Sequence, residues 1–198
     1  MSDKPNTYGW QHTGQKRPDF ALEPGPGEES VWDYPRPPAI VDDPREVQVF
    51  AADGTLVATC SNSKRVLETA SPPTFYLPPS ALKVALEPVD GASYCEWKGQ
   101  AEYFRYQDQR LAWRYPKPTQ AFAEVAGWYA FYPAECRCVV AGETVRAQAG
   151  GFYGGWVTDE RVGPYKGEHG RAGPEGPTYT GWVQAAHHCR LNDRFYAK

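Results

Sequence analysis

The chain has 198 residues and a formal net charge of −3, and it contains 19 prolines and 19 glycines. This length fits one domain, or one domain with a long extension. The charge gives no electrostatic reason to bind nucleic acid or an anionic membrane surface, and no run of about 18 apolar residues is present to span a membrane. Five cysteines at irregular spacing, and an N-terminus without a signal-peptide pattern, predict a cytoplasmic protein with reduced thiols.

Proline and glycine at this density shorten helices and favour strands joined by turns. The 7 Trp, 13 Tyr and 8 Phe far outnumber the single Met, so the core is built from rings rather than from aliphatic helix stripes. These features predict a mainly β fold of compact antiparallel sheets, with one or two short helices and long loops rich in Pro and Gly.

Composition divides the chain into three parts. Residues 1–38 are polar and rich in Pro, and we expect an extended arm that lies on the domain through its aromatic side chains. Residues 39–140 carry the strand patterns of a β core domain. Residues 141–198 form a Gly-rich loop extension and a tail that we expect to pack on the core.

The first strong pattern after the arm is a hairpin over 46–60, because apolar and polar residues alternate on the way to the Asp53-Gly54 turn signal. A single helical turn is expected over 63–69. The best helix is expected over 119–126, where Thr119 provides an N-cap. The remaining strand patterns cover residues 74–77, 94–106, 110–115, 128–132 and 136–140.

The strand expected over 94–106 carries the first candidate for chemistry. Its odd positions form an apolar face and its even positions a polar face, and Gly99 invites a bulge or a close approach. Alternation puts Lys98 on the polar side, where most lysines lie. Gly99 could instead re-aim Lys98 into a cleft, where surrounding rings would desolvate its ammonium and lower its pKa. The lysine would then serve as a base, a nucleophile or an anion anchor.

Arg65 and Glu68 form the second candidate. They lie three residues apart and would share one side of the predicted helical turn. The simple interpretation is a surface ion pair. The functional interpretation makes Glu68 an acid/base group that Arg65 keeps ionised.

A set of aromatic residues could line a pocket for a flat or cationic ligand, although core packing accounts for most of them. The set comprises Trp97, Trp113, Tyr115, Trp128 and Tyr132.

Two further patterns resemble ligand sites only superficially. The glycines of 150–155 lack the Gly-Lys-Ser/Thr ending of a phosphate-binding loop, so we expect a structural loop. Cys136-x-Cys138 and His187-His188-Cys189 lack the paired Cys-x-x-Cys spacing of structural zinc sites. We therefore expect no metal and no cofactor.

Several strings, taken together, resemble one small domain family. They are Ala58-Thr59-Cys60-Ser61 followed by Arg65 and Glu68-Thr69, Pro73-Thr74-Phe75-Tyr76-Leu77-Pro78, Cys95-x-Trp97-Lys98-Gly99-x-Ala101-x-Tyr103, Ala112-Trp113-x-Tyr115-Pro116 and Phe131-Tyr132-Pro133. The family is catalogued as domain of unknown function 427 and is also labelled a nucleotidyltransferase family. The resemblance covers about residues 46–133, and residues 29–38 and 151–156 resemble a longer actinobacterial-type version.

The resemblance implies a β-tent-like arrangement, in which bent antiparallel sheets meet at an angle. It places seven residues on the family's signature positions: Arg65, Glu68, Tyr76, Lys98, Tyr103, Trp113 and Tyr115. It supplies no established reaction.

The nucleotidyltransferase label has little support in the residues themselves. Nucleotide addition needs Mg²⁺ held by paired carboxylates, commonly soon after a Gly-Ser turn. Asp42 and Asp43 precede Pro44 in an expected linker, and the sequence has no Gly-Ser dipeptide.

Three functions stay open at this point. The favoured one is a small-molecule binding protein or acid/base enzyme with a pocket between bent sheets. Its site would use Lys98 and Glu68 as the catalytic pair and Arg65, Tyr76, Tyr103, Trp113 and Tyr115 as binding residues. The second is a non-catalytic interaction module, whose partner is another protein or a second copy of the chain as a homodimer. The third is nucleotide transfer.

Overall fold

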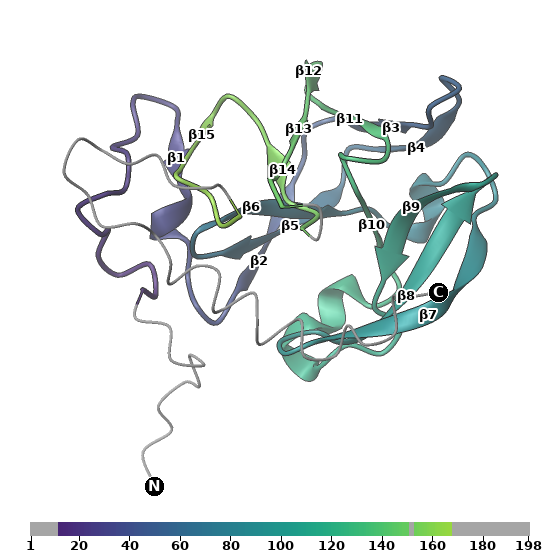
Figure 1. Cartoon of the computed structure of the whole chain (residues 1–198), viewed down its shortest axis with the longest axis horizontal. Helices are drawn as coiled ribbons and strands as arrows, with labels where there is room; N and C mark the ends of the chain where they lie inside the picture. Colours follow the sequence, from purple (N-terminus) through teal and green to yellow (C-terminus); the bar gives the residue numbers. More distant parts are fainter. Residues whose placement is uncertain (1–11, 151–152, 168–198) are drawn as a thin grey trace, which may run out of the picture.

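A computed structural model describes residues 12–150 and 153–167 of the chain. These residues form fifteen β-strands and three 3-10 helices, shown in Figure 1. Nearly all strand pairs are antiparallel, so the prediction of a mainly β fold is confirmed. Within the described residues, no helix has the length and apolar character needed to cross a membrane.

One four-stranded sheet has the order β10-β9-β8-β7 and lies at one side of the molecule in Figure 1. Its strands are β7 (Glu87–Cys95), β8 (Gly99–Tyr106), β9 (Gln109–Arg114) and β10 (Tyr129–Phe131). The single strand predicted over 94–106 is therefore wrong. The chain reverses between β7 and β8, and Cys95 pairs with Gly99 across the turn. The two residues still share a face, because directly paired residues of a hairpin point the same way.

A three-stranded sheet crosses the middle of the molecule in the order β2-β5-β6. Its strands are β2 (Ala39–Asp43), β5 (Ser63–Glu68) and β6 (Ser71–Tyr76). The helical turn expected over 63–69 is wrong, because that segment is the central strand of this sheet. Pairing on both sides satisfies its backbone groups, which a single isolated helical turn could not do.

A second four-stranded sheet, in the order β12-β11-β3-β4, contains the predicted hairpin. Its strands are β3 (Val47–Phe50), β4 (Leu56–Cys60), β11 (Arg137–Val140) and β12 (Glu143–Thr144). The antiparallel pairing of β3 with β4 around Gly54 (φ 85°) confirms the hairpin expected over 46–60.

Short strands attach the segments on either side of the core. β1 (Glu29–Ser30) pairs in parallel with β15 (Arg161–Val162), and β13 (Arg146–Ala147) pairs with β14 (Trp156–Val157). The β1–β15 pair brings residues far apart in the sequence together at the end of the molecule opposite the β7–β10 sheet (Figure 1).

All three helices are 3-10 helices: η1 (Val31–Asp33), η2 (Pro79–Ala81) and η3 (Gln120–Val125). The helix predicted over 119–126 is thus present only as η3, which is broken by the non-helical backbone of Phe122 (φ −116°, ψ 16°). A segment this short, confined between Pro118 and Gly127, cannot propagate an α-helix. Its buried Phe122 side chain packs into the core instead.

Two large hydrophobic clusters hold the sheets together. The first contains the stacked rings of Phe75 and Trp156, whose centroids are 4.7 Å apart. The second lies where the β2-β5-β6 sheet meets the β7–β10 sheet and η3. Leu77 and Tyr129 join these two sheets by reciprocal backbone hydrogen bonds of 2.8 and 2.9 Å. The second cluster contains most of the site residues predicted from the sequence.

Candidate functional site

Lys98 is the last residue of the turn between β7 and β8, and its side chain is directed into the protein. Only 9% of the residue is exposed. Its Nζ lies 5.3 Å from the ring centroid of Phe122 and 5.8 Å from that of Tyr115. Gly99, with φ of 93°, adopts the left-handed conformation that lets the chain turn at this point. Lys98 is thus buried, as the alternative to a polar-face position required, but it is placed by a turn between two strands and not by a bulge within one strand.

Three ionisable side chains from three strands lie within electrostatic range of the Lys98 ammonium. They are Glu68 of β5, Tyr76 of β6 and Cys95 of β7. Burial alone would lower the pKa of Lys98, but the negative charges that Tyr76, Cys95 and Glu68 can carry outweigh this effect and raise it. The pKa of Lys98 is therefore shifted in the direction opposite to the predicted lowering. We call Glu68, Tyr76, Cys95, Lys98, Tyr115 and Phe122 the Lys98 cluster.

The ammonium has no ion pair with any carboxylate of the described residues, because none lies within 4.0 Å of Nζ. Aromatic faces and a thiol are its neighbours instead. The pair predicted from the sequence, Lys98 with Glu68, shares one cluster but forms no salt bridge.

Tyr76 adds a second buried donor to the cluster. The residue is fully buried, and within residues 12–150 and 153–167 its hydroxyl has no hydrogen-bond partner. Trp113 lies close enough to favour the ionised form slightly, but it is not in hydrogen-bonding geometry. Burial is the main influence and raises the pKa of Tyr76 to about 12. At neutral pH this hydroxyl keeps its proton and can donate it.

The other predicted aromatic residues pack around these donors. Tyr103, Trp113 and Tyr115 belong to the same hydrophobic cluster and are 5–7% exposed. The Tyr103 hydroxyl donates to Ser93 at 2.6 Å. The Trp113 ring lies against the backbone of Gly154, where an added Cβ would be 2.1 Å from the ring. Gly154 therefore serves close packing, in line with the structural loop expected there.

Arg65 lies elsewhere, and its predicted pairing with Glu68 is wrong. Because residues 65–68 form a strand, residues an odd number apart point to opposite faces. In the pairing of β5 with β6, Arg65 lies opposite Phe75, whereas Tyr76 lies opposite Lys64 and therefore points to the other face of the sheet. The guanidinium reaches Asp43 at 2.9 Å and Glu29 at 3.1 Å on that other face.

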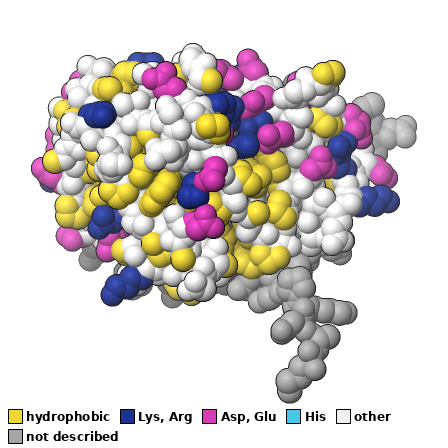
Figure 2. Space-filling model, turned by 180° about the vertical axis from the view of Figure 1, so that it is seen from behind, with side chains coloured by type: hydrophobic (Ala, Val, Ile, Leu, Met, Phe, Trp, Pro, Cys, Tyr) yellow, Lys and Arg dark blue, Asp and Glu magenta, His cyan; other side chains and the backbone are white. Residues whose placement is uncertain are grey.

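These contacts are part of a larger ion network. Its six members are Glu29, Asp43, Arg45, Arg65, Glu160 and Arg161. Asp43 and Arg161 are nearly fully buried. Figure 2 shows the same tendency on the surface, where Lys and Arg side chains lie next to Asp and Glu rather than in one basic field.

Glu68 instead pairs with Arg36, a residue of the arm that the sequence analysis did not single out. Arg36 Nη1 donates to Glu68 Oε1, and Nη2 donates to Glu96 Oε1 at 2.8 Å. The guanidinium lies 5.2 Å from the ring centroid of Trp97. Residue 36 lies in the segment 29–38 that resembles the longer family version, and in a Trp-x-Tyr-Pro-basic-Pro string shared by 32–37 and 113–118, but neither feature assigns a contact.

In the part of the chain that the structure describes, the residues that could ligate a metal do not gather at one place, unlike the donors of the Lys98 cluster. Within the described ranges, no group of three or more His, Cys, Asp or Glu residues is arranged so that it could hold a metal ion. Cys136 and Cys138 are buried with their Sγ atoms 3.8 Å apart. His187-His188-Cys189 lies outside the described residues.

Asp42 and Asp43 are the last two residues of strand β2. The linker that the sequence analysis expected at this position is therefore wrong. Asp42 accepts from Lys64 at 2.6 Å, and Asp43 accepts from Arg45 and Arg65. Both carboxylates are thus already neutralised by cations.

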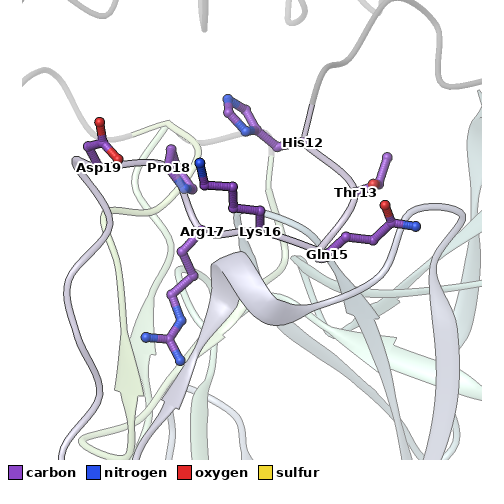
Figure 3. A pocket seen from close by; sticks show the side chains of 7 residues that line it. All are labelled: His12, Thr13, Gln15, Lys16, Arg17, Pro18 and Asp19. Atoms are coloured by element: carbon purple, nitrogen blue, oxygen red, sulfur yellow. The ribbon is translucent and has the colours of Figure 1, made fainter.

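A hollow of about 390 Å³ lies in the arm, formed by the segment 12–19 (Figure 3). Arg17 at its wall bonds Asp33 at 2.6 Å. None of the predicted site residues lines this hollow.

The fold and the Lys98 cluster define a mainly β domain with a buried lysine where two sheets meet. A family model described as "Domain of unknown function (DUF427)", labelled NTP_transf_9, matches residues 39–142, which is more than half of the chain. The chain belongs to this family, as its sequence strings predicted. A comparison with curated proteins gives no match.

Proposed function

We propose that the protein binds a small molecule through a carboxylate or similar anionic group, held between Lys98 Nζ and the hydroxyl of Tyr76. The observation that carries this proposal is a buried phenol without a hydrogen-bond partner within the described residues, beside a buried ammonium that forms no ion pair with a described carboxylate. Lys98 is a cation over two rings, and Tyr76 is a fully buried phenol.

Unsatisfied buried donors are energetically unfavourable. A buried hydroxyl without a partner costs about 1–3 kcal/mol relative to one that is bonded, and a buried unpaired charge costs more. A carboxylate has two oxygens that accept from both donors and a charge that neutralises the ammonium. The buried rings of Tyr115 and Phe122 supply the apolar surroundings of this position.

The raised pKa of Lys98 supports anion binding over base catalysis. A general base must be unprotonated at working pH, and the environment of Lys98 favours the charged form. The ammonium can anchor an anion or donate a proton, so an acid/base reaction with Glu68 remains a prediction beyond this proposal.

The surroundings of the two acidic residues of β2 favour ligand binding over the nucleotide transfer that the family label suggests. Asp42 and Asp43 are bonded to Lys64, Arg45 and Arg65, so they are held by the protein's own cations. The described cysteines carry free thiols, which supports a cytosolic setting for this binding protein.

The proposal is tested by screening a panel of small carboxylates for saturation-transfer NMR signals with wild-type protein and with Lys98→Met. We expect ligands whose signals disappear with Lys98→Met. The matched control is Lys64→Met, which also removes a lysine near a ring: Lys64 Nζ lies 5.9 Å from the centroid of Trp128, but it pairs with Asp42 and Glu124. Signals that persist with Lys98→Met, or a panel without any binder, would contradict the proposal.

A further inference from the structure

We infer that Arg36 is a positioning residue for this anion site: it keeps Glu68 away from Lys98, and the Arg36–Glu68 pair limits the ligand to a single negative charge. The inference rests on the proposed function and names the ligand class as a monocarboxylate.

Arg36 is fixed in place by contacts on three sides. Its side chain is only 8% exposed. The guanidinium donates to Glu68 on β5 and to Glu96 in the turn before Lys98, and it lies over the ring of Trp97. One arm residue therefore bridges the two sheets whose junction holds Lys98.

Glu68 has two cations within electrostatic reach. It forms its hydrogen-bonded ion pair with Arg36, while its charge also acts on the Lys98 ammonium. Without Arg36, the Glu68 carboxylate would be left partly buried without its partner, which is strongly unfavourable. Lys98 is the cation to which it would turn. An internal carboxylate would then occupy the ammonium that we assign to the ligand.

The same arrangement restricts the charge of the ligand. The site offers one cation, Lys98, and one neutral donor, Tyr76, to an incoming anion. Glu68 keeps its negative charge close to that position. A monocarboxylate balances the lysine, whereas the second charge of a phosphate monoester would meet Glu68, whose cation Arg36 is already shared with Glu96.

The test uses calorimetric titration at pH 7.5 with two probes of similar body, benzoate and phenyl phosphate. We expect the wild-type protein to prefer benzoate. Arg36→Met should weaken benzoate binding at least about tenfold, and Arg36→Met combined with Glu68→Gln should restore it, because the amide cannot neutralise Lys98. Glu96→Gln, which removes the other carboxylate bonded to Arg36, is the matched control and should change benzoate binding less than about threefold.

Glu68→Gln alone gives a second measurement that does not require Arg36→Met to fold. It should narrow or reverse the preference for benzoate over phenyl phosphate. The role of Arg36 would be overturned by an unchanged preference in Glu68→Gln. It would also be overturned if Arg36→Met weakened benzoate binding and the added Glu68→Gln did not restore it. In either case, benzoate binding that still depends on Lys98 would leave the proposed function standing. Binding of neither probe, or binding that survives Lys98→Met, would contradict the proposed function itself.

Discussion

The ion network and the Lys98 cluster both bury cations, but they surround them differently. In the network, each of Arg45, Arg65 and Arg161 contacts at least one carboxylate. In the Lys98 cluster, the ammonium lies over two rings beside a phenol and a thiol. Removing one partner of an internally balanced buried pair destabilises the fold, whereas a buried charge left without a counterion is suited to an external one.

The positions of the two regions support this distinction. The network joins β1, β2, β5 and β15, so it ties segments on both sides of the family-matched region 39–142 to the core. The Lys98 cluster lies inside that region, where the two sheets meet. We therefore expect the network to contribute to stability, and we propose that the cluster contributes to binding. The predictions below separate these two roles by their effect on the free energy of unfolding.

The largest loss of stability is expected for Asp43→Asn. Asp43 is 2% exposed and holds Arg45 and Arg65, so its replacement leaves two partly buried guanidinium groups without this counterion. Removing one partner of a buried ion pair costs about 3–5 kcal/mol. Urea denaturation followed by circular dichroism measures this loss. A loss below about 1 kcal/mol would show that the network behaves like an exposed set of ion pairs.

A smaller loss is expected for Gly154→Ala. The new Cβ would lie 2.1 Å from the Trp113 ring, so the ring must move within the second hydrophobic cluster. Overpacking of this kind costs about 1–3 kcal/mol. The control is Gly25→Ala, whose Cβ meets only the flexible Glu28 side chain at 3.3 Å. Equal denaturation midpoints for the two variants would contradict the close packing of Trp113 on the loop.

Mild acid should weaken the network by less than Asp43→Asn does. Burial alone would raise the pKa values of Glu29 and Asp43, but hydrogen bonds from Tyr34 and Arg45, with the charges of nearby arginines, lower both. A lowered folded-state pKa gives stability that is complete above the unfolded value of about 4 and is lost as the pH falls through the folded value.

Urea denaturation of wild type and Asp43→Asn at pH 7 and pH 3.5 measures this dependence. The wild type should lose more stability on acidification than the variant, which has no carboxylic acid at position 43. Identical losses would mean that Asp43 does not contribute to the acid sensitivity.

The smallest change in stability is expected for Lys98→Met. Replacing a buried charge with an apolar side chain of similar length is often neutral or stabilising, so we expect a free energy of unfolding within about 1 kcal/mol of the wild type. Thermal and urea denaturation measure it. A loss as large as that of Asp43→Asn would make Lys98 a structural cation and remove the contrast between the two regions.

The sequence predicted the fold class because Pro, Gly and aromatic content constrain the class strongly. It predicted the hairpin over 46–60 because Asp53-Gly54 is a local turn signal. It failed over 63–69, where pairing with β2 and β6 decides the structure, and such pairing is not local. The turn before Gly99 was also missed in the sequence analysis, because an alternating pattern continues unchanged across a tight hairpin.

The candidate site was predictable only in part, because some of its contacts join segments that are far apart in the sequence. Family strings placed Lys98, Tyr76 and Trp113 on signature positions, and in the structure Tyr76 and Trp113 share one core cluster while Lys98 lies within electrostatic range of Tyr76. The role of Arg36 could not be read, because only tertiary contact places the arm between Glu68 and Glu96. The direction of the Lys98 pKa shift was also inaccessible, because it depends on the charges of neighbouring strands.

The most direct test of the account is a crystal structure of the protein soaked with benzoate. We predict a carboxylate within about 3 Å of both Lys98 Nζ and the Tyr76 hydroxyl, with Glu68 still bonded to Arg36. A structure in which Lys98 pairs with Glu68 and benzoate is absent from the cluster would contradict it.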